Sequence, residues 1–159
     1  MKKDLLYIAN DIEASGGLVG IHSILSWGAC VVTPEPVPME ELRKQGWIYY
    51  EELRPMTMNY VMEAMRVACL GLRCLEPHKE DARYDPRSTL FVPERVLGVL
   101  LLKGTPPELA THRFKKWIIK MQSIFGRQVE FVADTVIFDP SHLSFYFSRF
   151  GQSTPYGYA

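Results

Sequence analysis

The 159-residue chain is balanced in charge, because 18 Lys and Arg residues match 18 Asp and Glu residues. This balance excludes a global basic field for nucleic acid or an anionic membrane, so any contact with nucleic acid has to be local. With 47% hydrophobic residues, the chain is long enough to bury the core of one domain, and we expect a single domain over residues 1–159.

The composition also indicates the cellular compartment and whether the chain would associate with a membrane. Three cysteines, an odd number, indicate free thiols and a reducing environment, so a cytoplasmic protein is expected. No stretch approaches the roughly twenty apolar residues of a membrane span, and no membrane partner is expected.

The first part of the chain reads as three strands. Residues 5–13 alternate as in a strand, which puts Asp11 and Glu13 on the same face. Residues 20–32 and 47–53 are rich in β-favouring side chains and predict the second and third strands, joined by a polar connection. We expect the three strands to form an antiparallel meander.

Helical periodicity begins after the third strand. Apolar residues near a period of 3.6 predict a helix within residues 59–72, with Asn59 as its cap. The following stretch, residues 75–95, is polar and contains three prolines, which predicts an insertion or loop.

The second half predicts a long helix, a strand and a last helix. The long helix has Thr105 as cap, Pro106 in the first position and Gly126 at its end. A strand within residues 128–139 and a helix over residues 140–151 follow. The order β-β-β-α-α-β-α predicts a three-layer α/β domain on a mixed sheet, the order found in ribonuclease-H-like folds.

Carboxylates dominate the candidate functional residues. Asp11 and Glu13 lie about 6.5 Å apart along a strand and can converge on cations, which would offset their mutual repulsion. The alternative is that the strand frays at Asn10 and leaves both acids in a solvated turn. Asp139 directly precedes Pro140, so it could cap the last helix, and a cap at this position is compatible with a role as metal ligand.

Short motifs around these acids resemble those of the DEDD-type 3′–5′ exonucleases. The segment "NDIEASG" resembles the family's first motif, "ADTVIFD" the second, and "HRFKKWI" the helix between them. The resemblance implies that Asp11, Glu13 and Asp139 are ligands of a two-metal site for Mg²⁺ or Mn²⁺. It also implies that residues 14–16, which are Ala14, Ser15 and Gly16, lie against the terminal nucleotide of a single-stranded 3′ end.

The third motif of that family, a last Asp preceded by a His or Tyr base, is not matched. Asp139 is the last acid, His142 follows it too closely, and neither Tyr156 nor Tyr158 is followed by an acid. We therefore expect a domain that is short at its C-terminal end, with a homodimer or partner chain supplying the missing elements. The alternative is a non-catalytic descendant that binds nucleic acid or protein.

Other candidate residues favour structural roles. Cys69, Cys74 and His78 fit no common zinc spacing. His22 and His112 are expected to be satisfied or solvated. An aromatic stripe at helical spacing is expected in the core and comprises Phe145, Tyr146, Phe147 and Phe150. A group of lysines is expected on a solvated helix face and comprises Lys115, Lys116 and Lys120.

Overall fold

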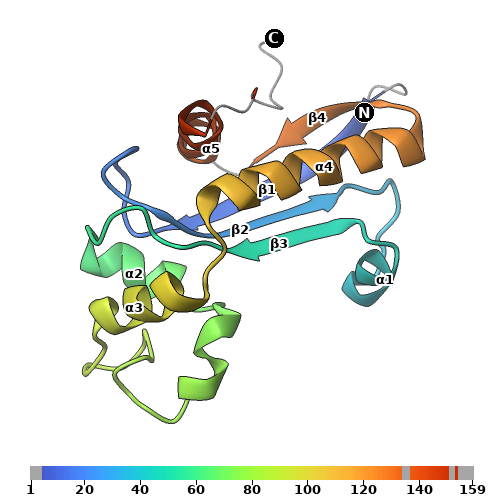
Figure 1. Ribbon diagram of the computed structural model, residues 1–159. Helices are drawn as coiled ribbons and strands as arrows, with labels where there is room; N and C mark the ends of the chain where they lie inside the picture. Colours follow the sequence, from blue (N-terminus) through green and yellow to red (C-terminus); the bar gives the residue numbers. More distant parts are fainter. Residues whose placement is uncertain (1–4, 134–136, 151–152, 154–159) are drawn as a thin grey trace. The chain divides into compact units, whose positions relative to one another are not determined.

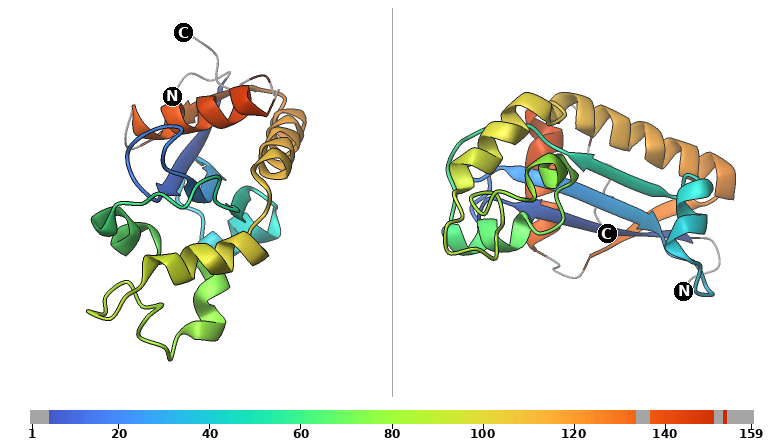
Figure 2. Two further views of the ribbon diagram at one scale, coloured as in Figure 1. Left: turned by 60° about the vertical axis from the view of Figure 1, so that its left-hand side comes forward. Right: turned by 90° about the horizontal axis from the view of Figure 1, so that it is seen from below.

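The described residues contain a mixed sheet of four strands in the order β3-β2-β1-β4. The computed structural model describes residues 5–133, 137–150 and 153. The strands are β1 (Leu5–Ala14), β2 (Ile24–Val31), β3 (Ile48–Glu52) and β4 (Gln128–Val132). Figure 2 shows them side by side, and β2 runs opposite to β1 and β3 (Figure 1).

The sheet is not the three-strand meander expected from the sequence. The first three strands are neighbours in chain order, but β1 lies inside the sheet because β4 pairs with its other side. This pairing is parallel and sets Ile8 opposite Phe131 and Ala9 opposite Val132. A parallel neighbour needs a crossover connection, and the long helix before β4 provides the return. The α/β class is confirmed.

Within the described residues, six helical segments accompany the sheet, and three of them lie where the sequence predicts no helix. They are α1 (Met39–Lys44), α2 (Met62–Ala68), the 3₁₀ helix η1 (Arg73–His78), α3 (Pro93–Lys103), α4 (Pro107–Phe125) and α5 (Phe138–Arg149). The unpredicted ones are α1, η1 and α3. The polar connection before β3 holds α1. The expected loop of residues 75–95 is shorter than predicted, because η1 overlaps its start and α3 begins at Pro93. Residues 79–92, between η1 and α3, contain only turns. None of the helices in the described ranges combines the length and apolarity that a bilayer crossing requires.

The start of α4 differs from its prediction by one residue, because Thr105 has a different partner. The Thr105 hydroxyl donates to a carboxylate oxygen of Glu51 at 2.7 Å, and its N–H donates to the Glu52 carbonyl at 2.8 Å. These bonds hold Thr105 beside β3, and α4 begins at Pro107. Its end is as predicted, since Gly126 adopts a φ of +61°.

Contacts divide the chain into two compact units. The first unit comprises Met1–Asp11, Gly28–Tyr50 and Thr111–Ala159, and the second comprises Ile12–Trp27 and Glu51–Ala110. In the first unit, aromatic rings join the sheet to its helices. The ring of Phe114 on α4 lies 5.0 Å from Tyr49, 6.0 Å from Phe131 and 6.3 Å from Phe147, measured between centroids.

The second unit has an apolar core of its own. Buried side chains from α2, η1 and α3 pack there together with Leu25 of β2 and Phe91. Pro93 occupies the first turn of α3, where its missing N–H costs nothing, and buried side chains at Val96, Leu97 and Leu100 hold the helix on this core.

Candidate catalytic carboxylates and their surroundings

Asp11 and Glu13 both lie within β1, which continues to Ala14. Burial alternates along this part of the strand: Ile12 and Ala14 are buried, whereas Asp11 is exposed and Glu13 half-buried. Both carboxylates therefore share the more open face, as alternation predicts. The alternative in which the strand frays at Asn10 is wrong, because the ladder extends beyond both acids.

Asp139 is the second residue of α5 and not its cap. The cap position belongs to Ile137, and no side chain makes a capping hydrogen bond there. The Asp139 side chain is only 2% exposed. The capping interpretation is therefore wrong, and the carboxylate occupies the first turn, where the helix dipole favours a negative charge.

Two of the three acids belong to the first unit and lie toward the same edge of its sheet. Because β1 and β4 are parallel, with Ala9 opposite Val132, both strands end at one edge. Asp11 follows Ala9 along β1, and α5 with Asp139 begins beyond the end of β4 (Figure 1). Glu13 falls in the second unit. Among the residues that the structure describes, no three His, Cys, Asp or Glu side chains are grouped closely enough to hold a metal ion.

Within the second unit, Glu13 acts electrostatically on Cys69 at the end of α2. Burial, and then the negative charge of Glu13, raise the pKa of the Cys69 thiol to about 12. Burial and the Glu52 carboxylate likewise raise the pKa of Cys74 to about 12. Both thiols stay protonated at neutral pH, so neither is an activated nucleophile.

Ser15, in the segment that the resemblance sets against a terminal nucleotide, is held by four hydrogen bonds. Its hydroxyl donates to the Asn59 carbonyl at 2.7 Å and accepts from the Ser23 N–H at 3.0 Å. Its N–H donates to the Ser23 carbonyl at 2.9 Å, and its carbonyl accepts from Val61 at 2.8 Å. Asn59 is thus an acceptor for Ser15 and not the cap of α2, whose cap position is Val61.

Gly16 is required by the close approach of His22. A Cβ at Gly16 would lie 2.5 Å from Nδ1 of His22, closer than two such atoms can come. The same Nδ1 accepts the N–H of Leu18 at 2.9 Å. His22 is buried and shapes the turn after β1, which agrees with the structural role predicted for it.

A second serine, Ser23, extends this network and was not singled out by the sequence. Its hydroxyl accepts the N–H groups of Met56 and Thr57, both at 3.0 Å, and donates to the Thr57 carbonyl. The Thr57 hydroxyl in turn donates to the Ile21 carbonyl at 2.6 Å. The sequence contains one signal for this network, which is the presence of serines within an apolar run, because a buried hydroxyl needs a hydrogen-bond partner.

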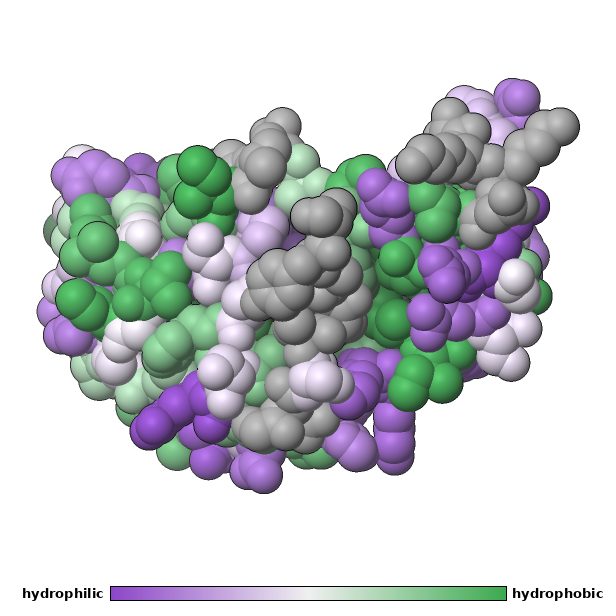
Figure 3. Space-filling view, turned by 90° about the horizontal axis from the view of Figure 1, so that it is seen from above, coloured by the Kyte–Doolittle hydropathy of each residue, from purple (hydrophilic) through white to green (hydrophobic). Residues whose placement is uncertain are grey.

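Exposed hydrophobic side chains surround this network. They belong to the connection between β1 and β2 and to the stretch before α2, and are Leu18, Val19, Ile21, Met58 and Val61, called here the apolar rim. Figure 3 shows that hydrophobic side chains reach the surface in several places on one face of the molecule.

The remaining candidates fall in the first unit. Of the four aromatic residues expected in the core, Tyr146 and Phe147 are fully buried, whereas Phe145 and Phe150 are half-buried. The Lys115 ammonium lies 2.8 Å from the Ser153 hydroxyl. His142, one turn after Asp139, is buried, with Nδ1 3.1 Å from the Phe138 carbonyl oxygen. Tyr156 and Tyr158 lie outside the described residues.

Comparison with known proteins gives one informative relative. No family model matches the chain. The chain is 27% identical over 154 residues to the 3′-5′ DNA exonuclease Cap18 of Escherichia coli, an alignment that covers 97% of this chain and 63% of the relative. The chain thus spans less than two thirds of the relative's length, and the similarity supports an exonuclease family.

Proposed function

We propose that the chain is a 3′–5′ exonuclease domain that hydrolyses phosphodiester bonds at the 3′ ends of single-stranded DNA. The observation that carries this proposal is the similarity to a 3′-5′ DNA exonuclease along 97% of the chain. Asp11, Glu13 and Asp139 support it, because they lie where β1 ends and where α5 begins, as in the motifs of DEDD-type exonucleases.

We further propose that the fold is ribonuclease-H-like. Support comes from the mixed sheet in which β1, the strand with two acids, lies inside, with β4 parallel to it. In α/β sheets, ligands commonly bind beyond the carboxyl ends of the strands, which is the edge toward which Asp11 and Asp139 lie.

The donor set suits the metal ions that the resemblance implies. Asp11, Glu13 and Asp139 offer only carboxylate oxygens, which hard ions such as Mg²⁺ and Mn²⁺ prefer. When bound, these ions would supply an activated water and stabilise charge on the leaving oxygen.

The other residues of the site have positioning roles in this proposal. The hydrogen bonds of Ser15 fix the backbone of residues 14–16, and the lack of a side chain at Gly16 leaves room for His22 behind it. A fixed surface of small residues holds a terminal nucleotide at little ordering cost.

The test is the release of labelled mononucleotides from uniformly labelled single-stranded DNA, with RNA of the same sequence in parallel and Mn²⁺ present. We expect release from DNA by the assembly in which a homodimer or partner chain supplies the unmatched third motif, and loss of it in Asp11→Asn and Asp139→Asn. Glu35→Gln, which neutralises an exposed acid away from the site, serves as the control. Turnover that survives both site substitutions would rule out these carboxylates.

A further inference from the structure

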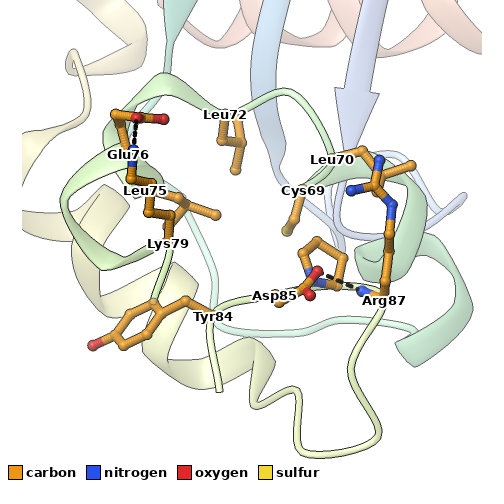
Figure 4. A pocket seen from close by; sticks show the side chains of 10 residues that line it. Cys69, Leu70, Leu72, Leu75, Glu76, Lys79, Tyr84, Asp85 and Arg87 are labelled. Atoms are coloured by element: carbon orange, nitrogen blue, oxygen red, sulfur yellow. Dashed lines mark hydrogen bonds and ion pairs between the residues drawn. The ribbon is translucent and has the colours of Figure 1, made fainter. Parts of the chain in front are cut away.

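A cavity of about 320 Å³ lies within the second unit, distinct from the carboxylates discussed above. Its walls come from the end of α2, from η1 and from the loop of residues 79–92 (Figure 4). This volume is at the lower end of the range of about 300 to 1,000 Å³ that small-molecule sites occupy. The space therefore suits a small ligand and not a polymer.

The floor of the cavity is apolar. Cys69, Leu72 and Leu75 line it, and all three are buried members of the core of this unit. The Cys69 thiol is neutral because burial raises its pKa to about 12. Because these side chains already expose little surface, a flat apolar body bound against them would gain mainly van der Waals contact.

The opening of the cavity is charged. Glu76 and Lys79 form an ion pair at 3.0 Å, with both side chains largely exposed. Asp85 accepts the backbone N–H of Arg87 at 2.9 Å. The Arg87 guanidinium makes no hydrogen bond or ion pair within the described ranges. In Figure 4, Arg87 and Lys79 lie on opposite sides of the opening.

The loop that forms the outer wall is held in place, although it has no helix or strand. The Arg66 guanidinium donates to the carbonyls of Pro86 at 2.6 Å and Ser88 at 3.0 Å. The Tyr84 ring stacks on His78 with centroids 4.4 Å apart. A wall built in this way needs little ordering when a ligand enters, and long structured loops of this kind often carry function.

We propose that this cavity binds a nucleoside 5′-monophosphate, with the base on the apolar floor and the phosphate at Arg87. Arg is suited to phosphate because its planar guanidinium offers paired donors. The exposed ion pair of Lys79 contributes little to stability, so the Lys79 ammonium is able to turn to the same phosphate. The choice of a nucleotide as ligand rests on the proposed function, because an exonuclease releases mononucleotides. The cavity and its charged groups do not depend on that function.

Calorimetry with dAMP tests the proposal on the whole chain. The titration is made with chelator and in the Asp11→Asn background, so that metal-dependent binding at the carboxylates cannot contribute. Deoxyadenosine and inorganic phosphate are titrated separately. We expect saturable dAMP binding that Arg87→Gln weakens about ten-fold, the usual order for a charged hydrogen bond, and weaker binding of either fragment alone.

Two matched variants locate the binding. Arg43→Gln removes an exposed guanidinium on α1 and should leave the dAMP affinity unchanged, whereas Leu70→Trp, at an exposed lining position, should obstruct the opening and weaken it. The proposal is overturned by absence of dAMP binding up to about 5 mM, by equal affinity in Arg87→Gln and wild type, or by phosphate alone binding as tightly as dAMP. The binding experiment involves neither turnover nor metal, so its result can be interpreted even if the nuclease assay shows no activity. Likewise, absence of dAMP binding would leave the result of the nuclease assay unaffected.

Discussion

The Ser15 hydroxyl donates to the Asn59 carbonyl at 2.7 Å and joins the turn after β1 to the stretch before α2. The two residues are 44 positions apart in the chain. Through this bond, the segment that we propose to hold a terminal nucleotide is fixed by a part of the chain that carries no catalytic candidate. The same serine accepts a hydrogen bond from Ser23, so its loss affects both sides of the turn.

Ser15→Ala should lower the free energy of unfolding by about 1 to 3 kcal/mol, because it removes a buried hydroxyl and leaves the Asn59 carbonyl and the Ser23 N–H without this partner. Urea unfolding followed by circular dichroism measures the change. Ser123→Ala, on an exposed position of α4, is the matched control and should change stability little. Equal stability of the two variants would contradict the role given to Ser15.

Gly16→Ala should destabilise the protein by about 1 to 3 kcal/mol, because the added Cβ meets the His22 ring. His22→Ala removes that ring and should relieve the clash, although it also removes the acceptor for Leu18. The double variant should therefore be more stable than the sum of the single effects predicts, by at least about 0.5 kcal/mol. Additive effects would show that the two residues do not meet.

Where local pattern decides, the sequence predicts the structure well. The alternation of β1, with Asp11 and Glu13 on one face, follows from strand geometry alone, and the end of α4 follows from a glycine at Gly126. Both signals lie within a few residues of the feature that they specify. For the same reason the buried positions of Tyr146 and Phe147 were correctly expected from helical spacing.

Where a distant partner decides, the sequence misleads. Thr105 has the residue type and position of a helix cap, but the Glu51 carboxylate takes its hydroxyl. Asp139 before Pro140 also reads as a cap, yet α5 begins at Phe138, two residues before the predicted start, and the carboxylate is buried. The position of β4 beside β1 depends on the return of the chain after α4, which no local window contains.

Cys69 gives a pH-dependent prediction. Its pKa is about 12 in the folded protein, above the ordinary value of 9.0, so the unfolded thiol ionises first as the pH rises. The stability associated with the neutral thiol is present below pH 9 and is lost between pH 9 and 12. Cys69→Ala should therefore show a smaller alkaline loss of stability than wild type in urea unfolding at pH 7, 9 and 10. Parallel pH profiles for the two proteins would count against this ionisation.

The apolar rim predicts association. Exposed hydrophobic side chains that gather on one surface usually mark a site of contact with another molecule, and Leu18 is 59% exposed there. If a second copy covers this surface, Ile21→Lys should shift the protein toward the monomer in sedimentation velocity at high micromolar concentration. Leu102→Lys, on an exposed position of α3 outside the rim, is the control. A wild-type protein that stays monomeric would exclude a homodimer, while leaving a different partner chain to be sought.

Removal of the metal, or of one of its carboxylates, gives the sharpest test of the proposed site. Asp11 is exposed, so Asp11→Asn should leave the free energy of unfolding nearly unchanged while weakening Mn²⁺ binding at least about ten-fold, because one of three attracting charges is lost. Asp139 is buried in the first turn of α5, so Asp139→Asn should weaken Mn²⁺ binding and also alter stability.

Isothermal titration with Mn²⁺, urea unfolding of each variant and nuclease assays before and after treatment with chelator separate these effects. Glu35→Gln should match wild type in all three. If Asp11→Asn binds Mn²⁺ as tightly as wild type while its nuclease activity is lost, Asp11 acts on the substrate and not on the ion; if both are retained, Asp11 does not belong to the site.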